Sequence, residues 1–92
     1  MIRTVVLSKR AQKDLKKIPS YIQILFQDWL EDVEDRGLEE VRKIPGYHDE
    51  PLQGDRRGQR SIRLTRSYRA IYQIVQGRVE FVLVEEVNKH DY

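Results

Sequence analysis

Residues 60–87 read RSIRLTRSYRAIYQIVQGRVEFVLVEEV, and most of this stretch alternates between apolar and polar side chains. The alternating apolar residues fall on either side of a turn near Arg66-Ser67: Ile62 and Leu64 before it, and Ala70, Tyr72 and Ile74 after it. A period of two is that of a β-strand with one buried face. Gln76-Gly77 is typical of a hairpin turn, and Val79–Val87 is apolar on both faces, as a central strand would be. The stretch therefore predicts three consecutive antiparallel strands.

The N-terminal part of the chain predicts a strand followed by two helices. Ile2–Leu7 is rich in β-branched residues, and Ser8 follows it as a helix N-cap. Helical spacing then continues on both sides of Pro19, and Gly37 is a fitting end for the second helix. The apolar residues at this spacing are Ala11, Leu15 and Ile18 in the first helix, and Ile22, Leu25, Phe26, Trp29, Leu30 and Val33 in the second. We expect the two helices to form a hairpin whose apolar stripes belong to the core.

The order of elements predicts the fold class. Leu38–Ile44 is consistent with a short third helix, and the residues between it and the strands, including the polar stretch 53–58, are expected to form loops. The order β-α-α-(α)-β-β-β indicates an α+β fold, in which a small, mostly antiparallel sheet carries the N-terminal helical hairpin on one face. Residues 1–92 are expected to form a single domain with the other face of the sheet at least partly open.

The composition excludes several classes of protein. The chain has no cysteine, so it can form neither a disulfide framework nor a thiolate metal site. Its apolar runs are far shorter than the roughly 18 residues that span a bilayer, and its N-terminus lacks a signal-peptide pattern, so we expect a cytoplasmic protein. Common metal, nucleotide and hydrolase motifs are also missing from the sequence, and neither a metal nor a cofactor is expected.

Charge is unevenly distributed along the chain, although the net charge is only +2. Residues 28–40 contain seven acids and one arginine, whereas residues 56–69 contain six arginines and no acid. Such a basic stretch in a small domain indicates a surface that binds a polyanion. The alternative is a solvated surface that balances the acidic helix.

Strand alternation separates two of the arginines from the rest. Arg63 and Arg69 have the parity opposite to the apolar residues of their strands, so both should point to the open face of the sheet. Two guanidinium groups on adjacent strands could bind one phosphate and stabilise a pentavalent phosphorane. The alternative is that they pair with acids of the same chain. Contacts with an RNA backbone are expected from a second set, formed by Arg56, Arg57, Arg60, Arg66 and Lys89.

The last residues of the chain could supply proton transfer. RNA cleavage through the 2′-hydroxyl needs a base for the 2′ proton, an acid for the 5′ oxygen and cations for the phosphate. His90 and Tyr92 could act as base and acid, or Tyr92 could stack on a nucleobase. The alternative for a histidine at this place is an idle solvated residue. His48 is expected to be an ordinary loop residue.

Several motifs occur together in an order that resembles a known family. They are Glu50-Pro51-Leu52, Gly58, Ser61-x-Arg63-Leu64-Thr65, Arg69-x-x-Tyr72, and the terminal His90 and Tyr92. In this order they resemble the RelE/ParE superfamily of toxin–antitoxin toxins, and within it the YoeB-like ribosome-dependent mRNA interferases. The N-terminal strand and Ser8-x-x-Ala11-x-x-x-Leu15 are also similar to the superfamily, so the resemblance covers nearly the whole chain.

The resemblance implies an activity, partners and residue roles. It implies a RelE-like fold, metal-independent mRNA cleavage on the ribosome, and a cognate antitoxin as partner. Glu50 falls at the general-base carboxylate, Arg69 at the phosphate-stabilising arginine and Arg63 at a second arginine of the active site. His90 and Tyr92 fall at the terminal His and Tyr, but here Asp91 separates two residues that are adjacent in that branch. The division of acid and base roles among Glu50, His90 and Tyr92 therefore stays open.

Two other functions fit the same sequence. One is a ParE-like protein that poisons DNA gyrase by binding it and has no nuclease activity. The other is a plain RNA-binding module whose C-terminal residues are catalytically idle. The acidic stretch 28–40 could dock an antitoxin, or could simply be a solvated helix face.

Overall fold

The computed structural model describes residues 1–87 and has the predicted α+β architecture. Its five strands form one sheet in the order β1-β5-β4-β3-β2, in which only β1 and β5 are parallel. The elements are β1 (Val5–Leu7), α1 (Lys9–Lys17), α2 (Ser20–Arg36), α3 (Leu38–Val41), a 3₁₀ turn η1 (Pro45–Tyr47), β2 (Glu50–Pro51), a second 3₁₀ turn η2 (Gly54–Arg56), β3 (Arg60–Arg63), β4 (Tyr68–Val75) and β5 (Arg78–Glu86). The predicted fold class is confirmed.

The elements differ from the predicted ones mainly at their ends. The first strand is shorter than predicted, and the third helix stops at Val41 rather than at Ile44. Strand β2 lies where a loop was expected, and it pairs with β3 through two residues only. The turn at Gln76-Gly77 is confirmed: both residues have positive φ angles, 51° and 75°, as a type I′ hairpin turn requires. Across residues 1–87, no helix is both long enough and apolar enough to cross a membrane.

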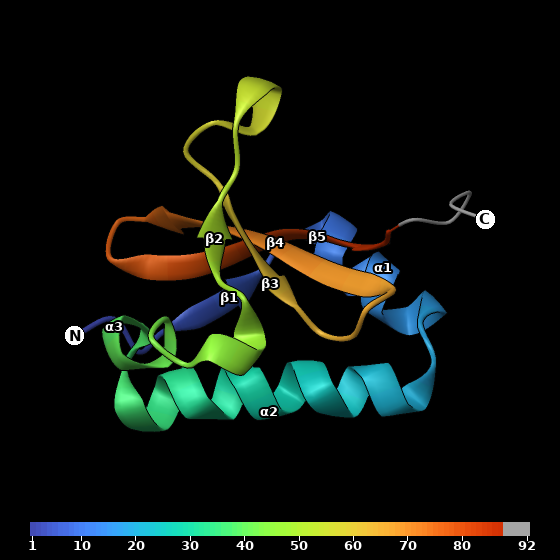
Figure 1. Cartoon of the computed structure of the whole chain (residues 1–92), viewed down its shortest axis with the longest axis horizontal. Helices are drawn as coiled ribbons and strands as arrows, with labels where there is room; N and C mark the ends of the chain where they lie inside the picture. The colour runs from blue at the N-terminus through green and yellow to red at the C-terminus, as the bar shows by residue number, and fades with distance from the viewer. Residues whose placement is uncertain (88–92) are drawn as a thin grey trace.

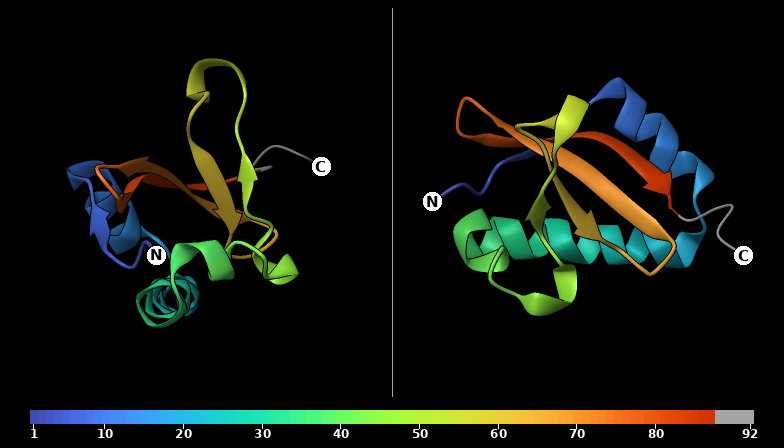
Figure 2. Two further views of the ribbon diagram at one scale, coloured as in Figure 1. Left: turned by 90° about the vertical axis from the view of Figure 1, so that its left-hand side faces the viewer. Right: turned by 45° about the horizontal axis from the view of Figure 1, so that its top comes forward.

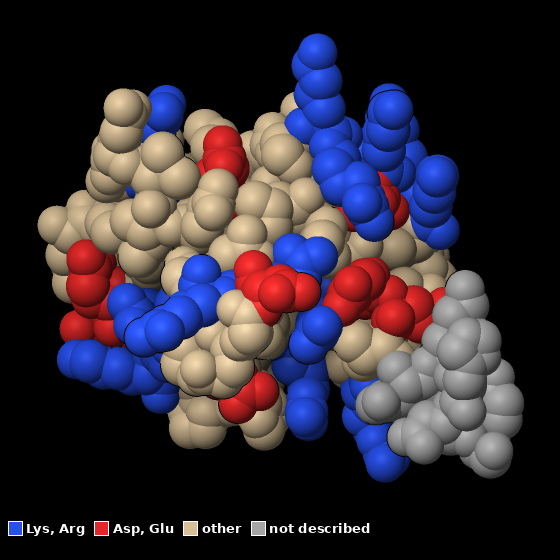
Figure 3. Space-filling view, turned by 90° about the horizontal axis from the view of Figure 1, so that it is seen from above, with Lys and Arg blue, Asp and Glu red and all other residues tan. Residues whose placement is uncertain are grey.

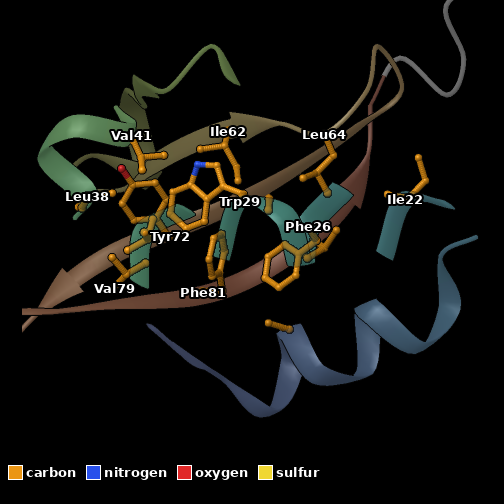
Figure 4. Packing of buried hydrophobic residues seen from close by; sticks show 14 residues of the cluster. Ile22, Phe26, Trp29, Leu38, Val41, Ile62, Leu64, Tyr72, Val79 and Phe81 are labelled. Atoms are coloured by element: carbon orange, nitrogen blue, oxygen red, sulfur yellow. The ribbon is translucent and has the colours of Figure 1, made fainter. Parts of the chain in front are cut away.

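The core lies between the helices and one face of the sheet. Figure 1 shows α2 running along this side, while α1 lies beside β5. At the centre is Trp29, which is fully buried and packs its ring against Tyr72 and Phe81, with centroid distances of 5.6 and 5.2 Å. The labelled side chains in Figure 4 come from α2, α3, strands β3 to β5 and, for Leu64, the turn that follows β3, and they point toward one another. The predicted apolar stripe of the second helix is therefore core.

Helix α1 also covers part of one edge of β5. Strand β1 pairs with β5 only at Val79–Phe81, which leaves later backbone groups of β5 without a strand partner on that side. Ser8 Oγ donates a hydrogen bond to the carbonyl of Val82, and Asp14 Oδ2 accepts one from the amide of Val84, both at 3.0 Å. Edge groups satisfied in this way cannot pair with another chain.

Replacing Ser8 should show how much the N-cap of α1 contributes to the stability of the protein, compared with a serine at an exposed surface position. Ser8 Oγ also accepts a hydrogen bond from the amide of Ala11 at 3.0 Å, so Ser8→Ala removes an N-cap and a link to β5 together. We expect the free energy of unfolding in urea to fall by about 1–2 kcal/mol. Ser67→Ala, in the exposed β3–β4 turn, is the matched control. Equal stability of the two variants would show that the cap contributes nothing.

Candidate active site

The register of the sheet arranges charged side chains in a row on the face away from the core. Arg63 of β3 lies directly opposite Arg69 of β4, and Arg69 lies opposite Glu85 of β5. Residues in cross-strand register point to the same face of a sheet. The prediction that Arg63 and Arg69 share the open face, on adjacent strands, is therefore confirmed. Glu50 of β2 lies opposite Ser61, at the start of the neighbouring row.

These rows border an open pocket of about 500 Å³. The residues that line it include Glu50, Arg63, Arg66, Arg69 and Glu85, together with His48 from the segment before β2. This volume is within the usual range for ligand pockets. Figure 3 views the molecule from the side opposite α2 and shows Lys and Arg side chains gathered close to Asp and Glu side chains. The pocket therefore offers several arginines to an anion and carboxylates that could exchange protons.

Arg69 is held by a carboxylate of the same pocket. Its Nε and Nη2 atoms both lie near Glu85 Oε2, at 2.6 and 2.5 Å. This is the alternative that the sequence left open for Arg69, whereas no acid of residues 1–87 forms an ion pair with Arg63. A guanidinium has five N–H donors, so Glu85 fixes its orientation and leaves three donors for a further anion. Two arginines directly opposite each other repel, and Glu85 offsets part of that repulsion.

A buried polar cluster lies beneath the start of β2. The side chain of Asp49 is fully buried; its Oδ1 accepts from Arg60 Nε and its Oδ2 from the hydroxyl of Tyr72, both at 2.6 Å. Burial raises the pKa of Tyr72, and the hydrogen bond to Asp49 raises it further, so this hydroxyl remains a proton donor. Through Arg60 and Tyr72, the cluster anchors the segment that carries Glu50 to strands β3 and β4.

A second contact anchors the preceding turn to the long helix. The hydroxyl of Tyr47 in η1 donates to Asp32 Oδ2 in α2 at 2.6 Å. Burial and this hydrogen bond raise the pKa of Tyr47. The segment between Tyr47 and Glu50 is thus tied down at both ends, once to α2 and once to the sheet.

The other predicted residues are distributed over three places. Arg66 lines the pocket, whereas Arg60 belongs to the buried cluster, where its side chain is 22% exposed. Arg56 and Arg57 lie at the tip of the β2–β3 hairpin, which stands out from the sheet in Figures 1 and 2. Lys89, His90 and Tyr92 lie outside the described residues. The RNA contacts assigned to these residues stay predictions.

Three pocket or anchoring residues were not predicted from the sequence: His48, Asp49 and Glu85. No local pattern indicated the first, because the left-handed backbone of His48, with φ 47°, interrupts the alternation of an extended segment. Within residues 1–87, no group of three or more His, Asp or Glu side chains is placed to bind a metal ion.

Solved structures with this fold include several small bacterial toxins. YafQ from Escherichia coli strain BL21(DE3) matches with a TM-score of 0.76 and 18% identity, covering 92% of this chain and 93% of YafQ. The toxin–antitoxin complex RelBE2 from Mycobacterium tuberculosis matches with a TM-score of 0.67 and 24% identity, over 90% of this chain and 95% of that one. A chain of the YoeB–YefM complex from Staphylococcus aureus gives a TM-score of 0.70 and 16% identity, covering 89% of this chain and 93% of that chain. No curated protein matches the chain by sequence.

The fold and the arginine-lined sheet define a toxin of the RelE/ParE superfamily. The chain belongs to the family described as the ParE toxin of type II toxin–antitoxin systems, parDE, whose model matches residues 5–90. The resemblance found in the sequence is thereby confirmed at the level of the superfamily.

Proposed function

We propose that this toxin is a ribosome-dependent mRNA endonuclease that inhibits translation. The observation that carries the proposal is the placing of the Glu50 carboxylate in one pocket with Arg63 and Arg69. A carboxylate beside two convergent guanidinium groups can accept a proton while the cations bind a phosphate. The resemblance of the motifs from Glu50 to Tyr72 to the YoeB-like interferases supports the same activity.

In the proposed reaction the RNA supplies its own nucleophile. Glu50 takes the proton of the 2′-hydroxyl, and the 2′ oxygen attacks the adjacent phosphorus. Arg63 and Arg69 stabilise the added negative charge of the phosphorane, with Arg69 oriented by Glu85. The bond from phosphorus to the 5′ oxygen then breaks, and this oxygen needs a proton. His90 and Tyr92 are the sequence-based candidates for donating it.

A cognate antitoxin is the proposed protein partner. Two of the solved structures with this fold, RelBE2 and YoeB–YefM, are toxin–antitoxin complexes. The remaining proposed partners are the ribosome and the translated mRNA. Binding to them through arginines on one face would weaken steeply with added salt.

The competing functions make different products. In a purified translation system with a defined mRNA, we expect wild type to cut the message only while it is translated. Glu50→Gln should cut about 10²–10⁴-fold more slowly, because the amide cannot accept the proton. Glu34→Gln, an exposed position on α2, is the control for loss of one acid.

Two outcomes of this experiment would contradict the proposal. Intact mRNA together with double-strand breaks in gyrase-treated plasmid DNA would identify a gyrase poison, a function favoured by the ParE name of the family. Ribosome or RNA binding without any cut would identify a plain binding module.

A further inference from the structure

His48 occupies a place in the pocket that its sequence neighbours do not suggest. It follows the 3₁₀ turn η1, and its backbone lies in the left-handed region, with φ 47° and ψ 48°. Residues with a Cβ adopt this conformation rarely, and it marks positions that the surrounding structure determines. The amide of His48 donates to the carbonyl of Pro45 at 3.1 Å, which closes the turn. The side chain is exposed and lines the same pocket as Glu50, Arg63 and Arg69.

The buried cluster explains why His48 and Glu50 face the same space. Between them stands Asp49, whose carboxylate is drawn into the protein by Arg60 and Tyr72. With the central residue of the three pointing inward, its two neighbours are left on the pocket side, and both line it. The arrangement is fixed by contacts of 2.6 Å on each carboxylate oxygen of Asp49, so it does not depend on a loose surface loop.

We propose that His48 is the proton donor for the 5′ oxygen, so that Glu50 and His48 form the acid–base pair of the site. The assignment rests on the proposed nuclease function. In the step, the 2′ oxygen forms a bond to phosphorus as its proton passes to the Glu50 carboxylate. The bond between phosphorus and the 5′ oxygen breaks, and a proton from the His48 imidazolium passes to that oxygen. The products are a 2′,3′-cyclic phosphate and a 5′-hydroxyl end.

The chemistry of the pocket suits this division of roles. Imidazole is the side chain that both holds and releases protons near neutral pH, whereas a carboxylate is already ionised there and can only accept one. The arginines that line the pocket already serve the phosphate and cannot give up a proton. Among residues 1–87, His48 is the only histidine, and it lies on the wall that carries the proposed base.

The test uses a leaving group that needs no proton. In an mRNA with sulfur in place of the bridging 5′ oxygen at the cut site, the thiolate departs without an acid. On ordinary mRNA we expect His48→Asn to slow cleavage by about 10²–10⁴-fold, and on the sulfur-containing mRNA by less than about tenfold. Asparagine is chosen because it tolerates the left-handed backbone, and His48→Gln is a second variant with a different side-chain length. Glu50→Gln should lose activity on both substrates, because Glu50 accepts the 2′ proton, a step that does not depend on the leaving group.

Each remaining outcome overturns the assignment. Equal losses of His48→Asn and His48→Gln on both substrates would mean that His48 is not the donor, as would full activity of both variants on ordinary mRNA. Selective rescue of His90→Gln, but not of the His48 variants, would assign the role to the C-terminal histidine. If wild type cuts neither substrate on the ribosome, the nuclease function itself fails, and the role of His48 fails with it.

Discussion

An Arg69→Ala variant is expected to cut translated mRNA about 10²–10³-fold more slowly than wild type and to lose its growth inhibition. Arg69 lies between Arg63 on one side and Glu85 on the other, so its guanidinium has a fixed position over the pocket. Removing it takes away the donors aimed at the developing phosphorane charge. The rate should be measured by single-turnover cleavage on purified ribosomes.

Protein stability should change little in the same variant. The side chains of Arg69 and Glu85 are 35% and 33% exposed, and such partly solvated pairs contribute about 0–1 kcal/mol. Arg78→Ala, at the far end of the β4–β5 hairpin, removes the same charge from an exposed site and should keep full activity. Arg69→Lys should be intermediate, because an ammonium keeps the charge but not the fork of donors. A fully toxic Arg69→Ala protein would refute the assignment of the site.

The largest effect on folding is expected for Asp49→Asn, with a loss of about 3 kcal/mol in the free energy of unfolding. The side chain of Asp49 is fully buried and receives hydrogen bonds from both Arg60 and Tyr72. An amide would turn an NH₂ group toward one of these donors and leave the Arg60 charge without its partner. Urea unfolding of both proteins measures the difference.

A surface ion pair provides the matched control for this variant. Glu40→Gln makes the same change from acid to amide in the pair with Lys43, whose side chains are 44% and 73% exposed. We expect a loss of no more than about 1 kcal/mol. Similar losses in the two variants would show that the buried cluster is not a structural anchor.

The sequence predicted the elements whose signal is local. Alternation located β3 and β4, and the i, i+3, i+4 spacing located α2 with its buried Trp29. Strand β2 was missed because two residues are too few for a periodic pattern; it exists only through its pairing with β3. The parallel neighbours β1 and β5 are also beyond local signals, since their pairing depends on packing between distant segments.

The same distinction applies to the site. Parity alone placed Arg63 and Arg69 together, and the register bears this out. The same rule puts Arg60 on the side of Ile62, facing the core, where the structure has it. The basic composition of residues 56–69 does not reveal this difference between Arg60 and the arginines that line the pocket. His48 and Glu85 join the pocket through the fold of separate segments, so no spacing in the chain indicates their proximity.

The parallel pairing of β1 with β5 has a consequence for the order of folding. It joins residue 5 to residue 79, whereas β3 pairs with β4, and β4 with β5, each with the next strand along the chain. Closing a long loop costs more entropy than closing a short one, and distant pairings slow folding. We expect the three-stranded meander to form first and β1 to dock last. The row Arg63–Arg69–Glu85 would then be in register before the hydrophobic core is sealed.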